Sequence, residues 1–322
     1  MTLPQALPPE VEALPHGIYA IDTGFHRPRF DAAYLIVEQG RAAFVDTGTN
    51  FAVPRLLAAL AAVGLTPAAV DWLIVTHVHL DHAGGAGLLM QSLPNARLVV
   101  HARGARHMID PSALFEGALA VYGEAEMARS YGTLVAVPSE RVVATHDEMT
   151  LQLAGRTLRF IDTPGHARHH HAIWDERSRG FFTGDTFGLS YHEFDVAGRA
   201  WLTPTTTPVQ FEPEPLKATV RRLLAFAPDC MYLTHFGRIA EVAPLGAQLI
   251  EQIDALVALT RDCGGDEAAL VRKLGGFYIE RLRAHGCSFA DAELLQLLNM
   301  DITLNAQGLA IWFARGASKA KQ

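Results

Sequence analysis

The segment Thr76-His77-Val78-His79-Leu80-Asp81-His82 of this 322-residue chain contains three histidines and an aspartate within six residues. All four side chains are of the kinds that bind metal ions in proteins. The segment follows an apolar run, residues 70–75, which predicts a short buried strand. On a helix, the side chains of His77 and His79 would point to different faces. On a loop that leaves a strand, both rings can converge on one cation. Imidazole and carboxylate together suit zinc, iron or manganese, so the segment predicts a metal site.

Further ligand-type residues stand where other predicted strands end. His166 follows a strand over 158–162, Asp185 follows one over 180–183, and His235 follows one over 230–233. Strand ends are rigid supports, which a metal site needs. Four ligands in six residues can crowd one ion or divide between two, and these additional residues favour division.

Alternating and continuous apolar runs predict a chain of strands and helices up to about residue 244, followed by helices alone. Asn50 is expected to cap a helix over 51–63. Residues 103–135 are expected to contain helical pieces and residues 186–212 to form a long loop, and both segments are expected to shape the substrate pocket. The other strands are expected at 17–22, 32–38, 41–46, 98–101, 141–144, 149–153 and 171–174, and the other helices at 86–93, 213–227, 245–261, 267–285 and 289–298.

In these features the chain resembles the metallo-β-lactamase-fold superfamily, in its glyoxalase II and lactonase-like hydrolase branch, over about residues 17–240. The family's H-x-H-x-D-H motif is present, and its other metal-site residues follow in order. The resemblance implies an α/β fold, an αββα four-layer sandwich with the metals at one edge between two sheets. It also implies a metal hydrolase domain, which we place at 1–244. Residues 245–322 lie outside the resemblance, and their helical spacing of apolar residues predicts a helical extension. The matching positions are His77, His79, Asp81, His82, His166, Asp185 and His235, with Asp46 at the first-strand aspartate.

The resemblance also implies a role for each of these residues. One metal is bound by three histidines (His77, His79, His166), and the other by Asp81, His82 and His235. Asp185 bridges the two ions, Asp46 orients a ligand, and Asp81 can also pass a proton to the leaving group. The expected cofactors are two divalent ions, zinc first, with iron or manganese as alternatives. A bridging water would attack an ester, lactone or thioester.

At several positions this chain differs from individual branches of the superfamily, and these differences narrow the predicted substrate. True β-lactamases of the fold carry cysteine at the position of Asp185, and flavodiiron proteins carry glutamate at that of His79. The run after Asp185, Thr-Phe-Gly-Leu-Ser-Tyr-His-Glu-Phe, does not match the glutathione-binding segment of glyoxalase II. We therefore expect neither antibiotic hydrolysis nor a glutathione thioester as substrate.

Three alternative functions remain open. A mononuclear-iron, persulfide-dioxygenase-like oxidoreductase would use only His77, His166 and Asp185, although the run Ala83-Gly84-Gly85 looks hydrolase-like. A nuclease-type phosphodiesterase is disfavoured by the net charge of −7, since phosphate binding needs cations. A non-catalytic binding module would turn over no ester or lactone at all.

Some side chains give weaker indications. Tyr191 and His192 lie in the loop after Asp185 and are candidates for substrate contact. The run His169-His170-His171 cannot bind one ion as a set, because neighbours on a strand point to opposite faces. One of them, His169 or His170, is expected to pack beside the metal site.

Composition bounds the remaining possibilities. Apolar residues make up 49% and charged residues 19%, which is globular rather than disordered. Three scattered cysteines form no disulfide framework. We expect no signal peptide and no apolar stretch of roughly 20 residues. The prediction is a cytoplasmic enzyme for a small-molecule substrate, without nucleic-acid or membrane partners. Its C-terminal helices are expected to cap the site, to form a homodimer face or to pack as an ordinary helical lobe.

Overall fold

The computed structural model describes residues 6–206 and 208–319, and the chain divides into two compact units. Unit 1 consists of Met1–Asp162, His169–Gly184 and Asp229–Ala240. Unit 2 consists of Thr163–Arg168, Asp185–Pro228 and Glu241–Gln322. The units do not follow a single cut in the chain, and the domain boundary at residue 244 stays a prediction.

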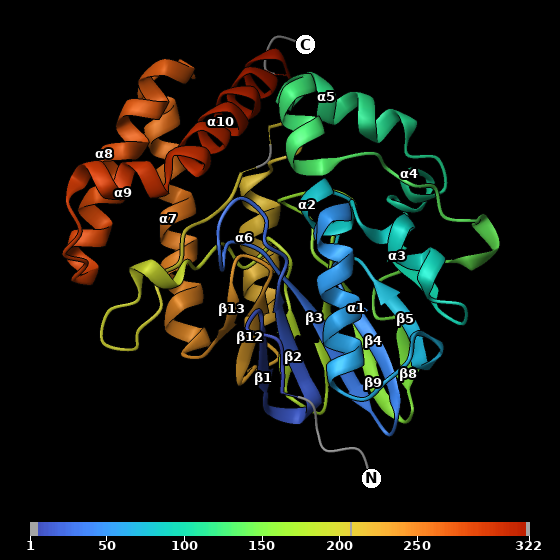
Figure 1. The fold of residues 1–322 in the computed structure, drawn as a ribbon. Helices are drawn as coiled ribbons and strands as arrows, with labels where there is room; N and C mark the ends of the chain where they lie inside the picture. The colour runs from blue at the N-terminus through green and yellow to red at the C-terminus, as the bar shows by residue number, and fades with distance from the viewer. Residues whose placement is uncertain (1–5, 207, 320–322) are drawn as a thin grey trace. The chain divides into compact units, whose positions relative to one another are not determined.

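Unit 1 contains two β-sheets (Figure 1). In the first sheet, seven strands lie in chain order, antiparallel from β1 to β4 and parallel from β4 to β7. The second sheet has the order β13-β12-β11-β10-β9-β8, and only β11 and β12 are parallel. The strands are β1 (Val11–Leu14), β2 (Ile18–Asp22), β3 (Ala32–Glu38), β4 (Arg41–Val45), β5 (Val70–Ile74), β6 (Arg97–His101), β7 (Val142–Thr145), β8 (Thr150–Leu153), β9 (Arg156–Asp162), β10 (His171–Asp175), β11 (Gly180–Phe182), β12 (Cys230–Leu233) and β13 (Gly237–Ile239).

Both faces of the first sheet are buried. One face shares an apolar core with the second sheet, and this core includes Tyr34, Phe160 and Tyr232. The other face packs against helices α1 (Val53–Ala62) and α3 (Ala86–Ser92), seen in front of the sheet in Figure 1. Burial on both faces explains why β3 and β4 read as continuous apolar runs rather than as alternation. The expected α/β class, with two sheets, helices and a C-terminal helical region, is confirmed.

Unit 2 is helical. Helix α6 (Pro213–Leu224) packs on α7 (Val242–Asp262), which contacts α8 (Glu267–His285) and α10 (Asn299–Lys319). Helix α9 (Asp291–Leu297) packs on α8 and α10. A buried Asn305 side chain donates to Tyr278 Oη at 2.8 Å and accepts from the Thr206 amide at 2.7 Å. This polar link ties the loop before α6 to two C-terminal helices.

Helix α7 is long and apolar enough, with a mean hydropathy of 1.3, to cross a membrane by length and composition alone. It is not an uninterrupted apolar stretch of about 20 residues, which the sequence was expected to lack, because Glu251 and Asp254 lie within it. In unit 2, however, its apolar side is buried, including Leu249, Ile253 and Leu256. Gln252 Nε2 also donates to the Leu202 carbonyl at 2.7 Å. A core helix of a globular unit shows this same pattern.

The cap predicted at Asn50 is wrong. The chain first forms a short 3₁₀ turn, η2 (Asn50–Ala52), and α1 begins at Val53. The Asn50 side chain instead donates to the carbonyl of Thr133, which ties η2 to a distant segment. A tertiary partner therefore replaced the local cap.

Candidate metal centre

The loop after β5 carries the first two predicted ligands. Thr76 is held at its start, because its amide donates to Asp46 Oδ1 at 2.7 Å. His77 is fully buried, and its Nε2 lies 2.8 Å from His79 Nδ1. The two rings therefore converge, as expected for a loop rather than a helix. Helix α2 (Leu80–Ala83) begins only after His79 and carries the next two ligands.

Asp46 is the buried anchor of this region. It directly follows β4 and has a left-handed backbone, with φ of 58°. Its Oδ2 accepts from Thr234 Oγ1 at 2.9 Å and from His82 Nδ1 at 2.9 Å. Together with the Thr76 contacts, these bonds join the ends of β4, β5 and β12. The arrangement fits the expected orienting role of Asp46, which stays a prediction.

Asp81, His82 and His235 form a compact group in unit 1, with ligand atoms within 4.8 Å of one another. Asp81 Oδ2 lies 3.7 Å from His82 Nε2 and 3.5 Å from His235 Nε2. Each histidine donates a hydrogen bond from Nδ1 to a protein acceptor. The acceptor is Asp46 Oδ2 for His82 and, at 3.0 Å, the Phe30 carbonyl for His235. Both Nε2 atoms thus face the carboxylate. These separations resemble the edge of a zinc tetrahedron, roughly 3.4 Å for ligand bonds of about 2.1 Å, so the group fits a divalent ion.

His166 and Asp185 form a second pair, in unit 2. His166 Nε2 lies 3.4 Å from Asp185 Oδ2, again close to a tetrahedral edge. The loop that holds His166 is fixed to α6 through Gly165, whose carbonyl accepts from the Glu212 amide at 2.8 Å. Gly165 has φ of 129°, and a Cβ there would lie 2.3 Å from the backbone of Leu216. Only glycine permits this close approach.

Each unit therefore brings predicted ligands close together within itself. Unit 1 contains the His77–His79 pair and the group of Asp81, His82 and His235. Unit 2 contains the His166–Asp185 pair. The distribution of the ligands between ions stays a prediction.

The histidine run lies beside the first pair. The rings of His169 and His170 have centroids 6.2 and 4.8 Å from that of His77. Burial lowers the pKa of His169 to about 3, with the neighbouring histidine charges acting in the same direction. His171 lies on β10, and its Nδ1 is 2.7 Å from Thr145 Oγ1. We expected one histidine of the run beside the metal residues, and two are there.

Tyr191 and His192 have different surroundings. Tyr191 is buried in unit 2, and its hydroxyl donates to Asp301 Oδ1 at 3.0 Å. His192 is partly exposed, and its Nδ1 lies 2.7 Å from Asp195 Oδ2. Their contact with substrate stays a prediction. The hydrogen bond from Tyr191 to Asp301 gives that tyrosine a role in packing that needs no substrate.

Sequence reasoning missed Thr76 and Thr234, the two threonines that bind Asp46. Thr76 Oγ1 lies 2.9 Å from Asp46 Oδ2, the same distance as Thr234 Oγ1. Each directly precedes a predicted ligand, as Thr76-His77 and Thr234-His235. The repeated Thr-His pair at two strand ends was the signal that could have identified them.

Comparison with known proteins agrees with this geometry. The model of the metallo-beta-lactamase superfamily matches residues 26–235. A metallo-beta-lactamase fold-containing protein of Sulfurisphaera tokodaii is 26% identical over 175 residues, 53% of this chain and 62% of the relative. A beta-lactamase-like protein 2 homolog of Caenorhabditis elegans is 24% identical over 152 residues, 47% of this chain and 42% of the relative. The chain thus matches less than two thirds of either relative's length.

Solved structures show the same fold. A metallo-beta-lactamase family protein of Thermus thermophilus superposes with a TM-score of 0.65 at 25% identity, covering 96% of each chain. An archaeal superfamily protein from Sulfolobus tokodaii gives 0.60 at 23% identity, covering 74% of this chain and 86% of that one. The fold and the His/Asp groups together indicate divalent metal binding, and the chain belongs to the metallo-beta-lactamase superfamily.

Proposed function

We propose that the chain is a metal-dependent hydrolase that binds two divalent ions and cleaves an ester, lactone or thioester. The observation that carries this proposal is the group of Asp81, His82 and His235. A single ion would need only the other predicted ligands, such as His77, His166 and Asp185. The Asp81 group adds a carboxylate and two imidazoles, which are enough donors for a second ion. When bound, the two ions would lower the pKa of a water and polarise the substrate carbonyl.

The ligand order of the family supports a division of the residues between the two ions. In this proposal His77, His79 and His166 would hold one ion, Asp81, His82 and His235 would hold the other, and Asp185 would serve both. Zinc is the expected metal, and the same donors accept iron or manganese.

The chain's own residues supply orientation and proton transfer. The bond from His82 Nδ1 to Asp46 fixes the tautomer in which Nε2 is the ligand atom, and the Phe30 carbonyl does the same for His235. The Asp81 side chain is partly exposed, unlike the two histidines that face it. It can therefore carry a proton from the site to the leaving group.

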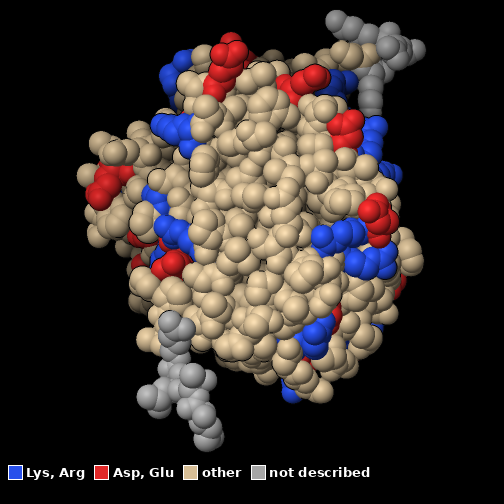
Figure 2. All heavy atoms as spheres, turned by 45° about the vertical axis from the view of Figure 1, so that its right-hand side comes forward, with Lys and Arg blue, Asp and Glu red and all other residues tan. Residues whose placement is uncertain are grey.

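The alternatives have less support. A mononuclear dioxygenase needs only His77, His166 and Asp185 and leaves the Asp81 group without a role. For a phosphodiesterase acting on nucleic acid we would expect a basic surface. On the face shown in Figure 2, cationic and anionic side chains are interspersed around a broad uncharged area. A small-molecule substrate and a cytoplasmic location remain part of the proposal.

Metal analysis followed by an activity panel tests this function. We expect about two ions per chain in purified protein, with turnover of at least one ester, lactone or thioester. His235→Ala should lose one ion and most of the activity. His146→Ala, at an exposed histidine outside the ligand groups, is the matched control and should lose neither.

One ion per chain at full occupancy, with oxygen consumed in the presence of glutathione persulfide, would instead establish the dioxygenase. Hydrolysis confined to bis(p-nitrophenyl) phosphate would favour the phosphodiesterase. No turnover in any assay would leave a binding module.

A further inference from the structure

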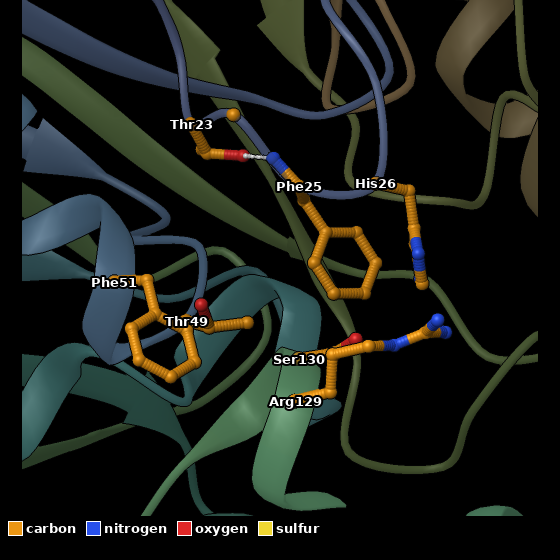
Figure 3. Close-up of a pocket in the computed structure, with 8 residues that line it drawn as sticks. Thr23, Phe25, His26, Thr49, Phe51, Arg129 and Ser130 are labelled. Carbon is orange, nitrogen blue, oxygen red and sulfur yellow. Dashed lines mark hydrogen bonds between the residues drawn. The ribbon is translucent and has the colours of Figure 1, made fainter. Parts of the chain in front are cut away.

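A cavity of about 270 Å³ lies within unit 1, between the loop that joins β2 to β3 and a helical turn, η4 (Met127–Tyr131). Figure 3 shows side chains from both segments around it, with Thr49 between the rings of Phe51 and Phe25 in this view. The two segments are about a hundred residues apart in the sequence, so the fold creates this cavity.

The cavity borders the Asp81 group. Thr49 lines it and follows the turn after Asp46, where the Thr47 amide donates to the His82 carbonyl at 2.8 Å. On the other side, the Phe25 ring lies 6.0 Å from that of Phe30, whose centroid is 5.6 Å from the ring of His235. A group bound in the cavity is therefore one layer of side chains from the proposed ion site.

The lining residues present a cation and hydroxyl groups. Arg129 and Ser130 come from η4, His26 from the facing loop, and the Arg129 side chain extends toward His26 in Figure 3. Among the described residues that line the cavity, none carries a carboxylate. Burial lowers the pKa of His26, which leaves Arg129 as the permanent charge.

Glu126 pairs with this cation without lining the cavity, and the Arg129 side chain stays 71% exposed. It forms an ion pair with Arg129 Nη2 and accepts from the Ser130 hydroxyl, and its Oε1 lies 4.0 Å from His26 Nε2. A guanidinium has five N–H donors, and the described contact with Glu126 uses Nη2. The remaining donors can bind an anionic oxygen in the usual two-pronged geometry.

Two aromatic rings complete the lining. Phe25 is buried against Phe30 and Tyr131, with the Tyr131 ring 5.5 Å away. Phe51 is 58% exposed, so part of its ring is open to solvent and available to a ligand. An apolar or aromatic portion of a substrate therefore fits beside the cation.

We propose that this cavity is a substrate subsite and that Arg129 selects hydrolysable esters carrying an anionic group, a carboxylate or a phosphate, on an apolar portion. This inference rests on the proposed hydrolase function and specifies its substrate class. His26 and Ser130 offer additional hydrogen bonds to the same group.

A matched set of aryl acetates tests the proposal in the metal-loaded protein. 3-Carboxyphenyl acetate and 3-phosphonophenyl acetate are anionic, and 3-carbamoylphenyl acetate is a neutral analogue of similar shape. We expect kcat/KM to favour an anionic ester by about tenfold, the value of one charge-assisted hydrogen bond. The preferred anion identifies carboxylate or phosphate as the natural group. Arg129→Gln should abolish the preference.

Arg97→Gln is the matched control, at an exposed arginine that does not line the cavity, and it should keep the preference. Binding gives a second measurement that needs no turnover. Benzenesulfonate, a poor metal ligand, should bind the wild type and the Arg97 variant in calorimetry more tightly than it binds the Arg129 variant. The neutral methyl phenyl sulfone should not distinguish the three proteins.

The outcomes separate the two proposals. If no ester is hydrolysed but benzenesulfonate binding depends on Arg129, the hydrolase function fails and the anion subsite stands. If esters are hydrolysed with equal kcat/KM whatever their charge, and Arg129→Gln changes neither kinetics nor binding, the subsite is overturned while the hydrolase function stands.

Discussion

His82 donates from Nδ1 to Asp46 Oδ2 across 2.9 Å, and both side chains are buried, at 0% and 1% exposure. This bond keeps the proton of the neutral His82 ring on Nδ1. Nε2, which faces Asp81, then has the free electron pair that binds a metal ion. Asp46 also accepts from Thr76 and Thr234, so one carboxylate sets the relative positions of three strand ends. The geometry of the proposed ion site therefore depends on a residue that is not itself a ligand.

Asp46→Asn should weaken divalent metal binding by about 10–100-fold, because an amide cannot accept all of these bonds at once. Zinc affinity is measured by competition with a chromophoric chelator. Thr234→Val removes a single donor to Asp46 and should have a smaller effect. An unchanged zinc affinity in the Asp46 variant would show that His82 is oriented by other contacts.

Much of the fold could be predicted from local pattern. Strand β3 and helix α8 lie at the residues expected, since a continuous apolar run and a helical repeat ending at Gly286 define them. Strands β1 and β13 were not predicted. Each is at the edge of a sheet and at most four residues long, so its stability depends on pairing with a neighbour rather than on intrinsic propensity.

The candidate site was predictable to a similar extent. Ligand-type residues near the ends of apolar runs, together with the family resemblance, indicated seven positions, whose metal binding stays a prediction. Thr76 and Thr234 were missed because their role is defined by a partner far along the chain, Asp46. The same holds for His26 and Arg129, which only the tertiary fold brings to one cavity.

The buried ion pair of Arg156 and Asp175 predicts how stability responds to acid. Arg156 Nε and Nη2 donate to the two Asp175 oxygens at 2.8 and 2.5 Å. Burial alone would raise the pKa of Asp175, but the bonds and charge of Arg156 lower it overall. The pair therefore contributes stability above the unfolded-state pKa of about 3.9, and this is lost as pH falls through the folded-state value.

Asp175→Asn should cost up to about 3–5 kcal/mol in unfolding free energy near neutral pH, because the buried Arg156 loses both of its charged hydrogen bonds to Asp175 and keeps the more distant carboxylate of Glu38, whose Oε2 lies 3.8 Å from Arg156 Nη1. Its urea midpoint should also fall less steeply than that of wild type below about pH 4. Asp229→Asn is the control, since Asp229 is exposed and its oxygen lies 3.4 Å from Arg179. A loss of similar size in both variants would argue against a special role for the buried pair.

The buried carboxyl of Asp31 should make the stability of the metal-free protein change with pH in the opposite direction. Burial raises its pKa to about 7, although the charges of His235 and His82 act to lower it. The folded chain therefore keeps a proton that the unfolded chain loses near pH 3.9, so this group's contribution to stability falls as pH rises from about 4 to 7. Asp31→Asn should remove that fall and be more stable than wild type at pH 8, by up to about 4 kcal/mol. Parallel urea midpoints for the two proteins from pH 5 to pH 8 would contradict the prediction.

Tyr191 and His192 were singled out together, and their surroundings predict different outcomes on substitution. Tyr191→Phe removes the buried hydrogen bond to Asp301. It should lower the unfolding free energy by about 1–3 kcal/mol, because a buried acceptor loses its donor. His192→Ala removes a partly exposed pair with Asp195, and the loss of such a pair should cost at most about 1 kcal/mol. If Tyr191 is structural, its variant shifts the urea midpoint and leaves KM unchanged for the preferred ester. A raised KM with an unchanged midpoint would show instead that Tyr191 contacts the substrate, which its burial argues against.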